Sequence, residues 1–214
     1  MTIRIKICGL RTPEIMRATL VAGADDVGLV FFPKSPRNIG LSEAAALAEI
    51  ARGRARIVAL AVDPSDALLD EITALVKPDI LQAHGNETPA RCLEIKSRWP
   101  VQVMKAISVG SAADAERAFD YVGAVDFILF DAKPPTDATL PGGNGVSFDW
   151  SLLQSVAARL PFMLSGGLNP GNVAAAIRAT GAGAVDVSSG VETAPGVKDA
   201  TLIGQFIAAA RGAT

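Results

Sequence analysis

The first residues of the chain alternate between apolar and polar side chains. In the segment Ile3–Cys8, residues 3, 5 and 7 are isoleucine, and the alternate positions hold Arg4, Lys6 and Cys8. A period of two residues predicts a β-strand. Short segments rich in valine, isoleucine, leucine and phenylalanine recur along the chain and predict further strands. The predicted strands are Arg4–Cys8, Asp26–Phe31, Arg56–Val62, Ile80–His84, Val101–Ala106, Asp126–Phe130, Phe162–Ser165 and Ala184–Val187.

Longer amphipathic segments separate these strands and predict helices. Side chains that can cap a helix stand at several of their starts. Thr12 and Asn169 each precede a proline, and Ser42 and Ser65 are further candidates. The predicted helices are Pro13–Ala22, Ser42–Arg52, Ser65–Lys77, Pro89–Trp99, Ser111–Tyr121, Trp150–Arg159, Pro170–Thr180 and Asp199–Arg211.

Alternation of strands and helices over 214 residues predicts one α/β domain, residues 1–214, with the fold of a (β/α)8 TIM barrel. A doubly wound open sheet is the alternative, and it would carry a glycine-rich fingerprint after its first strand. Cys8–Pro13 holds only one glycine, which favours the barrel. The longest segment without periodicity is Ala132–Phe148, and loops of this length are often lids or binding loops.

Composition limits the classes of function. Apolar residues make up 50% of the chain, which argues against disorder, and a net charge of −2 gives no sign of a nucleic-acid or membrane partner. No segment is apolar over enough residues to span a bilayer or to form a signal peptide, so we expect a cytoplasmic protein. Two cysteines in separate predicted elements and a single histidine predict neither a disulfide nor a metal site. Monomer and homodimer stay open.

Cys8 ends the first predicted strand, which is where a parallel barrel has its active site. A free cysteine is most often a small buried apolar residue, and that interpretation is favoured when Cys8 is taken alone. Its position at the barrel mouth favours a reactive group instead, and the cation of Lys6 on the same face of the strand would favour a thiolate. Cys8 is therefore a candidate base or nucleophile.

Asp131 follows the apolar segment Phe127–Phe130 and also lies at the carboxyl end of a strand. It could be an ordinary turn aspartate or pair with Lys133. In a barrel, however, the sixth strand is three steps from the first, so Asp131 and Cys8 would face each other across the mouth. A substrate between them could receive a proton on one side and lose one on the other.

Two glycine- and serine-rich turns follow the last two strands. Gly166 and Gly167 come after the seventh strand, and Ser188 and Ser189 come after the eighth. Both turns could simply need glycine for a positive φ. Loops at these two places form the usual phosphate site of TIM barrels, because bare backbone N–H groups can approach an anion. We therefore favour a phosphate site.

Other polar residues have weaker signals. Arg37 follows the second strand and is either a solvated loop residue or a fork for a carboxylate. Charges inside a barrel need partners, so we expect Lys6 to pair with Asp186 on the adjacent eighth strand, and Lys105 to need a partner if it faces the interior. His84, with Gln82 on the same strand, is a lesser candidate because a lone strand histidine is usually a hydrogen-bonded core group.

Several of these segments together resemble phosphoribosylanthranilate isomerases, the barrels of tryptophan biosynthesis. The similarity runs through the whole chain in order. The matching segments are Lys6-Ile7-Cys8-Gly9-Leu10, Ser35-Pro36-Arg37, His84-Gly85, Phe130-Asp131, Gly143-Asn144-Gly145, Phe148-Asp149-Trp150, Ser165-Gly166-Gly167-Leu168, Asp186-Val187-Ser188-Ser189-Gly190-Val191-Glu192, Pro195-Gly196 and Lys198-Asp199.

The resemblance implies an Amadori rearrangement of N-(5-phosphoribosyl)anthranilate by proton transfers, without a metal or an organic cofactor. It implies that Asp131 is the acid, that Cys8 is the base and that Arg37 contacts the anthranilate carboxylate. It assigns the phosphate of this small-molecule substrate to the region of Gly143, Gly145, Gly166, Gly167, Asp186, Ser188 and Ser189.

Three alternatives stay in view. The related isomerase of histidine biosynthesis has a carboxylate where Cys8 stands, and a synthase for the next tryptophan intermediate would bring a lysine acid and further amino-terminal sequence. A phosphate-binding barrel without catalysis would not need both Cys8 and Asp131. The resemblance therefore favours the isomerase.

Overall fold

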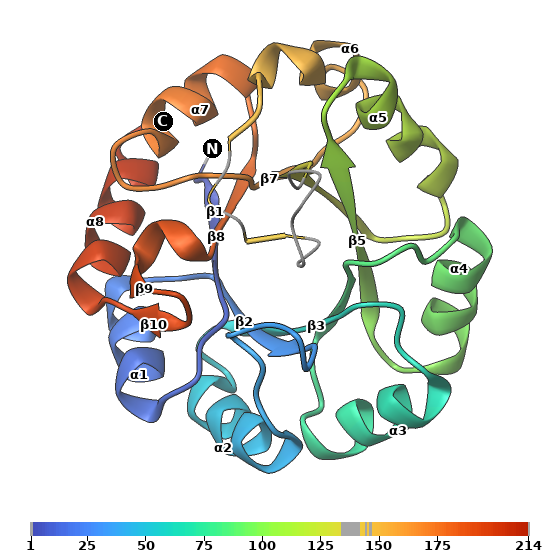
Figure 1. Cartoon of the computed structure of the whole chain (residues 1–214), viewed down its shortest axis with the longest axis vertical. Coiled ribbons are helices and arrows are strands. Elements are labelled where there is room, and N and C mark those ends of the chain that lie inside the picture. Colours follow the sequence, from blue (N-terminus) through green and yellow to red (C-terminus); the bar gives the residue numbers. More distant parts are fainter. Residues whose placement is uncertain (1, 134–141, 144, 146, 214) are drawn as a thin grey trace.

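The computed structural model describes residues 2–133, 142, 143, 145 and 147–213. Within them, parallel strands in chain order close into a barrel, and helices surround it (Figure 1). The predicted fold class is confirmed. The barrel strands are β1 (Arg4–Cys8), β2 (Asp26–Phe31), β3 (Arg56–Ala61), β4 (Ile80–Ala83), β5 (Gln102–Val109), β6 (Phe127–Ala132), β7 (Met163–Leu164) and β8 (Ala184–Val187).

Each strand is followed by helical structure, and a small hairpin follows β8. None of the helices in the described ranges is long and apolar enough to cross a membrane. The α-helices are α1 (Pro13–Ala22), α2 (Leu41–Ala51), α3 (Asp66–Leu75), α4 (Pro89–Arg98), α5 (Ala112–Glu116), α6 (Gln154–Ala157), α7 (Val173–Thr180) and α8 (Ala200–Arg211). The 3-10 helices are η1 (Arg117–Tyr121), η2 (Trp150–Leu153) and η3 (Ser189–Val191), and the hairpin is β9 (Glu192–Ala194) with β10 (Val197–Lys198).

Two predicted helices are each divided into an α-helical and a 3-10 segment. The segment predicted from Ser111 is α5 followed by η1, and the one predicted from Trp150 is η2 followed by α6. Over one or two turns, apolar spacing is nearly the same at 3.0 and 3.6 residues per turn. The sequence pattern therefore could not separate the two geometries.

Half of the predicted caps are correct. The Thr12 and Ser65 side chains accept hydrogen bonds from backbone N–H groups in the first turns of α1 and α3. The Ser42 prediction is wrong, because α2 begins at Leu41 after Gly40 and has no side-chain cap.

The predicted cap of α7 is also wrong. Asn169 lies in a tight turn ahead of the helix, where its side chain accepts a hydrogen bond from Gly171 N and its own N–H donates to the side chain of Asn172. Such side-chain bonds compete with helix formation. Pro170 therefore belongs to this turn, and α7 begins only at Val173.

The apolar core has two parts. The larger part lies between the strands and the surrounding helices, and it includes outward-facing residues such as Ile5 and Ile7. A smaller cluster fills the barrel interior and includes Val58, Met104 and Leu129. The strands of a parallel barrel are covered on both faces, and this is why they are so apolar.

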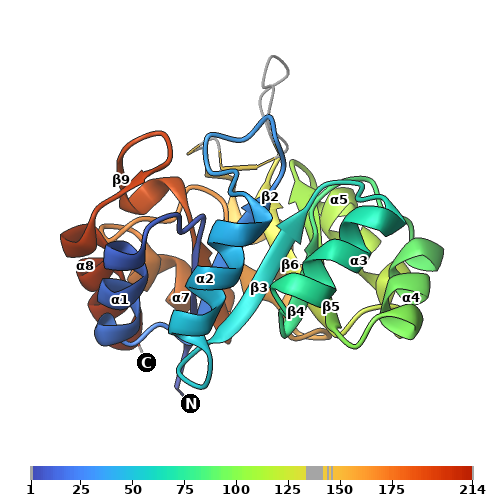
Figure 2. The ribbon, with the colours of Figure 1, turned by 90° about the horizontal axis from the view of Figure 1, so that it is seen from below.

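Charged residues close the amino-terminal end of the barrel interior. Asp26 on β2 is fully buried and accepts hydrogen bonds from Arg4 (2.8 and 2.9 Å) and Arg56 (2.8 and 3.3 Å). The Arg56 guanidinium also lies over the ring of Phe127, 5.0 Å from its centroid. Both chain termini are at this end, and the β9–β10 hairpin and the loop after β2 rise at the other (Figure 2).

Lys105 does not face the barrel interior. It alternates with the interior residues Met104 and Ala106, and its ammonium binds the Glu87 carboxylate at 2.9 Å on the outer side of the strands. Lys105 is thus a structural residue outside the site.

Candidate active site

A pocket opens at the carboxyl ends of the barrel strands and holds about 770 Å³ of open space. Parts of the predicted loop Ala132–Phe148, residues 134–141, 144 and 146, lie outside the described residues. All of the residues predicted for the site from the sequence line the pocket: Cys8, Arg37, Asp131, Gly143, Gly145, Gly166, Gly167, Asp186, Ser188 and Ser189.

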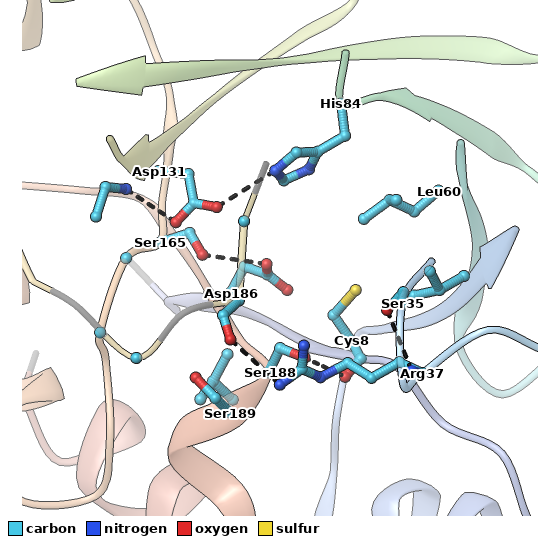
Figure 3. Close-up of a pocket in the computed structure, with 18 of the residues that line it drawn as sticks. Cys8, Ser35, Arg37, Leu60, His84, Asp131, Ser165, Asp186, Ser188 and Ser189 are labelled. Carbon is cyan, nitrogen blue, oxygen red and sulfur yellow. Dashed lines mark hydrogen bonds and ion pairs between the residues drawn. The ribbon is translucent and has the colours of Figure 1, made fainter. Parts of the chain in front are cut away.

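Cys8 is the last residue of β1 and is buried, with its sulfur directed into the pocket (Figure 3). The Ser188 hydroxyl donates to the Cys8 carbonyl at 3.1 Å, which ties the end of β1 to the loop after β8. Asp131 lies on the opposite side of the pocket, as the barrel order β6–β7–β8–β1 requires. The structure thus brings together the two groups predicted for acid and base.

The predicted effect of Lys6 on Cys8 is present, but it is smaller than the effect of burial. Burial raises the pKa of the Cys8 thiol, and the positive charges of Lys6 and Lys198 offset this only in part. Lys6 therefore favours the thiolate, as expected, but burial is the larger effect. The thiol keeps its proton to a higher pH than a free cysteine.

The predicted pair of Lys6 and Asp186 is confirmed. The Lys6 ammonium donates to an Asp186 oxygen at 2.9 Å, and both side chains are buried beneath the pocket. Burial alone would lower the pKa of Lys6, but Asp186 and Cys8 raise it, so Lys6 stays charged. The second Asp186 oxygen accepts from the Ser165 hydroxyl at 3.3 Å.

Asp131 is in contact with a histidine rather than a lysine. The carboxylate accepts from Ala132 N at 2.9 Å, and its other oxygen lies 3.3 Å from His84 Nε2. His84 Nδ1 in turn lies 2.8 Å from the Gln82 amide nitrogen. Lys133 lies 3.7 Å from Asp114 instead, so the alternative of an Asp131–Lys133 pair is not found.

Glycines lie close to this pair and in the loop after β7. A Cβ on Gly142 would lie 2.5 Å from His84 Nε2 and 2.6 Å from Asp131 Oδ2. Gly166 and Gly167 have φ angles of +85° and +62°, and a Cβ on Gly166 would lie 2.6 Å from Ala132 N. These positions bring bare backbone up to the pocket.

Arg37 is buried and is not the solvated loop residue that was one of the two interpretations. Its Nε and Nη2 atoms donate to the two oxygens of Glu192, each at 2.8 Å. Glu192 also accepts from Lys198 at 2.6 Å, and Lys198 donates to the carbonyl and hydroxyl of Ser188. Burial alone would raise the pKa of Glu192, but Arg37 and Lys198 hold it below its usual value.

The pocket has an apolar wall on the side of β2 and β3. Val30, Phe32, Leu60 and Val62 line it. In the described ranges, His, Cys, Asp and Glu residues nowhere form a group of three that could hold a metal ion.

Comparison with known proteins identifies the family of the chain. The sequence model of "N-(5'phosphoribosyl)anthranilate (PRA) isomerase" matches residues 5–209. The chain belongs to the phosphoribosylanthranilate isomerase family. One relative in the family, N-(5'-phosphoribosyl)anthranilate isomerase of Rhodopseudomonas palustris (strain BisB5), is 56% identical over 211 residues, which cover 99% of this chain and 97% of the relative.

Solved structures of the family share the fold. The phosphoribosyl anthranilate isomerase of Thermotoga maritima superposes with a TM-score of 0.89 at 37% identity, covering 98% of this chain and 99% of that one. A second isomerase structure, with a TM-score of 0.86, 36% identity and the same coverage of both chains, is a complex with reduced 1-(o-carboxyphenylamino)-1-deoxyribulose 5-phosphate.

Sequence reasoning gave no role to three side chains that the structure connects to the predicted site. His84 was a lesser candidate, and Glu192 and Lys198 had no assigned function. The Asp131 partner of His84 and the Arg37 partner of Glu192 are distant in sequence, so periodicity gave no signal for these contacts. The one available sign was that all three lie in or beside segments resembling the family.

Proposed function

We propose that this pocket isomerises N-(5'-phosphoribosyl)anthranilate with Asp131 as the general acid and Cys8 as the general base. As a member of the isomerase family, the chain converts this substrate to 1-(2-carboxyphenylamino)-1-deoxyribulose 5-phosphate in tryptophan biosynthesis. The roles of Asp131 and Cys8 are our proposal. The observation that carries them is the position of Cys8 and Asp131 on opposite walls of one pocket (Figure 3).

The reaction needs only proton transfers. Asp131 gives a proton to the ring oxygen of the ribose, the bond from that oxygen to C1 breaks, and C1 becomes part of a protonated Schiff base. Cys8, as a thiolate, removes the proton from C2, and the electron pair moves to give an enolamine. The enolamine takes a proton at C1 and loses the proton of its C2 hydroxyl, which gives the ketone. Asp131 then regains a proton from water, and the Cys8 thiol returns its proton to water. An acid and a base on opposite sides of the substrate suit this sequence.

The pocket walls support an assignment for each end of the substrate. The glycine loops at Gly166 and Gly167 and the serines at 188 and 189 would bind the phosphate, with Gly143 and Gly145 beside them. The Asp186 carboxylate is already neutralised by Lys6, so its presence beneath an anion is tolerable.

The other end of the substrate is an aromatic ring with a carboxylate. Val30, Phe32 and Leu60 offer an apolar wall for the ring. Arg37 would bind the carboxylate through the N–H groups that Glu192 does not use.

The proposal includes no metal or organic cofactor, since each step moves a proton. We also propose a cytoplasmic location, in keeping with the free thiols of Cys8 and Cys92, and an assembly no larger than a homodimer.

The experiment is a fluorescence assay on the purified chain. The anthranilate substrate fluoresces, and its isomerisation should quench the signal at a rate proportional to enzyme concentration. A chain that binds the substrate without quenching would be a non-catalytic phosphate-binding barrel. Quenching by the chain but not by Cys8→Ala and Asp131→Ala variants would support both roles.

A further inference from the structure

One edge of the Arg37 guanidinium is already occupied. A guanidinium offers a carboxylate two bidentate edges, one made by Nε with Nη2 and one by the two Nη atoms. Glu192 takes the first edge, with both contacts at 2.8 Å. The second edge lies where Arg37 lines the pocket, and its Nη2 also donates a hydrogen bond to the Gly143 carbonyl at 3.3 Å. Among the described residues, Nη1 has no hydrogen-bond partner.

Glu192 is held by donors only. One oxygen accepts from Arg37 Nε and from Lys198 Nζ, and the other accepts from Arg37 Nη2 and from Gly196 N at 3.2 Å. The side chains of Arg37, Glu192 and Lys198 are at most 7% exposed. Two cations and one anion leave one positive charge in excess at this side of the pocket.

The guanidinium has little room to turn. A Cβ on Gly9 would lie 2.7 Å from Arg37 Cδ, and a Cβ on Gly143 would lie 2.6 Å from Nη1, so the side chain passes between two bare stretches of backbone. The β9–β10 hairpin also packs closely against the loop that carries Arg37, since a Cβ on Gly196 would lie 2.5 Å from the Pro36 carbonyl. The β9–β10 hairpin therefore fixes both the loop and the side chain.

We propose that Glu192 is a positioning residue that makes the pocket selective for ligands with a carboxylate on the aromatic ring. By binding the Nε edge, Glu192 directs the other edge of Arg37 to the ring carboxylate. The positive charge of Lys198 offsets the negative charge of Glu192, so the site still attracts an anion. The inference rests on the proposed role of Arg37, and goes beyond it by assigning selectivity to a residue that does not touch the ligand.

The test is the binding of two ligands to wild type and to Glu192→Gln. One ligand is reduced 1-(2-carboxyphenylamino)-1-deoxyribulose 5-phosphate, and the other is the same compound without the ring carboxylate. The four groups that donate to Glu192 would then face the NH₂ group of a glutamine, which cannot accept their hydrogen bonds. Arg37 would therefore lose the contacts that fix its orientation. We expect calorimetry to give roughly a 10-fold or greater rise in Kd for the carboxylated ligand, the loss of about one charge-assisted hydrogen bond. The Kd of the other ligand should be unchanged.

Glu87→Gln is the matched control. Glu87 is equally buried at the same end of the barrel and pairs with Lys105, but it does not line the pocket. This variant should be destabilised without any change in the ratio of the two Kd values. If Glu192→Gln does not fold, Glu192→Asp is the second variant. It keeps the charge but draws the carboxylate back by one methylene. It should also raise the Kd of the carboxylated ligand relative to the Kd of the ligand without the carboxylate.

Arg37→Ala separates this inference from the proposed function. If Arg37→Ala abolishes the preference for the carboxylated ligand and the Glu192 variants do not reduce it, the positioning role is wrong and the carboxylate site stands. If Arg37→Ala leaves the preference intact, the carboxylate site itself is wrong. A rise in affinity for the carboxylated ligand in Glu192→Gln would mean that Glu192 competes with the ligand, and would also overturn the inference.

Discussion

The two ends of the barrel interior use similar charged residues for opposite purposes. At the amino-terminal end, Asp26 receives both arginines, Arg4 and Arg56, and the contacts close the barrel. At the carboxyl end, hydrogen-bonding capacity is left over: Arg37 lines the pocket, and its Nη1 has no hydrogen-bond partner among the described residues. Charges that satisfy one another stabilise a fold, whereas unsatisfied groups facing a pocket can bind a ligand.

This contrast predicts that substitutions at the pocket end reduce activity more than stability, and that substitutions at the closed end do the reverse. Four variants test it, from the largest expected effect to the smallest.

Cys8→Ser should lower kcat by about 10²–10⁴-fold, because a serine hydroxyl is far too weakly acidic to act as a base near neutral pH. Binding of the reduced product analogue should change only a few-fold, and the thermal midpoint should be close to that of wild type. In the wild type, kcat/KM should increase with pH, since burial raises the pKa of Cys8 and more thiolate forms as the pH rises toward it. Near wild-type turnover in Cys8→Ser would remove the thiolate from the mechanism.

Asp131→Asn should also reduce kcat by about 10²–10⁴-fold, since the amide keeps the shape of the side chain but has no catalytic proton to give. Ring opening should stall, while the ring-opened reduced analogue should bind nearly as well as to wild type. Titration calorimetry with that analogue is the measurement. Loss of analogue affinity in parallel with the rate would make Asp131 a binding residue, and the acid would have to be another group at the barrel mouth.

Arg37→Ala should act mainly on KM. Loss of a charge-assisted contact costs roughly 1.5–3 kcal/mol, which is a smaller effect than loss of the acid or the base. Steady-state kinetics on the anthranilate substrate gives the change, and a substrate without the carboxylate is the control. An equal loss on both substrates would assign Arg37 a role other than binding the carboxylate.

Asp26→Asn should lower the free energy of unfolding by roughly 1–3 kcal/mol and leave kcat and KM as they are. Burial alone would raise the pKa of Asp26, but hydrogen bonds from Arg4 and Arg56 lower it. The stabilisation is therefore complete above the unfolded value of ~3.9 and is lost as the pH falls through the folded value.

Urea unfolding of wild type and Asp26→Asn across this pH range is the measurement. The difference in stability should be constant near neutral pH and should disappear in acid. A difference that persists at the lowest pH would mean that the carboxylate charge is not what stabilises this end.

Sequence predicted the barrel well because strand periodicity and strand order are local and repetitive. The pairing of Lys6 with Asp186 followed from the closure of β8 on β1, and the opposition of Cys8 and Asp131 followed from counting strands. The hairpin β9–β10 was not predicted, because strands of two and three residues carry no periodicity.

The supporting residues of the site could not be predicted for a different reason. His84 contacts Asp131 from another strand, and Glu192 meets Arg37 across 155 positions of sequence. Such contacts depend on tertiary packing. The net effect on Cys8 was also out of reach, since the charge of Lys6 is visible in the sequence and the degree of burial is not.

Gly28 on β2 lies directly beside Cys8, the proposed base. A Cβ at this position would lie 2.8 Å from the Cys8 sulfur and 2.9 Å from its Cα, so the thiol occupies space that any other residue at position 28 would take. The evolutionary histories of positions 8 and 28 should therefore be linked. Replacement of Cys8 by a bulkier carboxylate is therefore possible only while residue 28 is glycine. A lineage that first acquired a side chain at position 28 could no longer make that replacement.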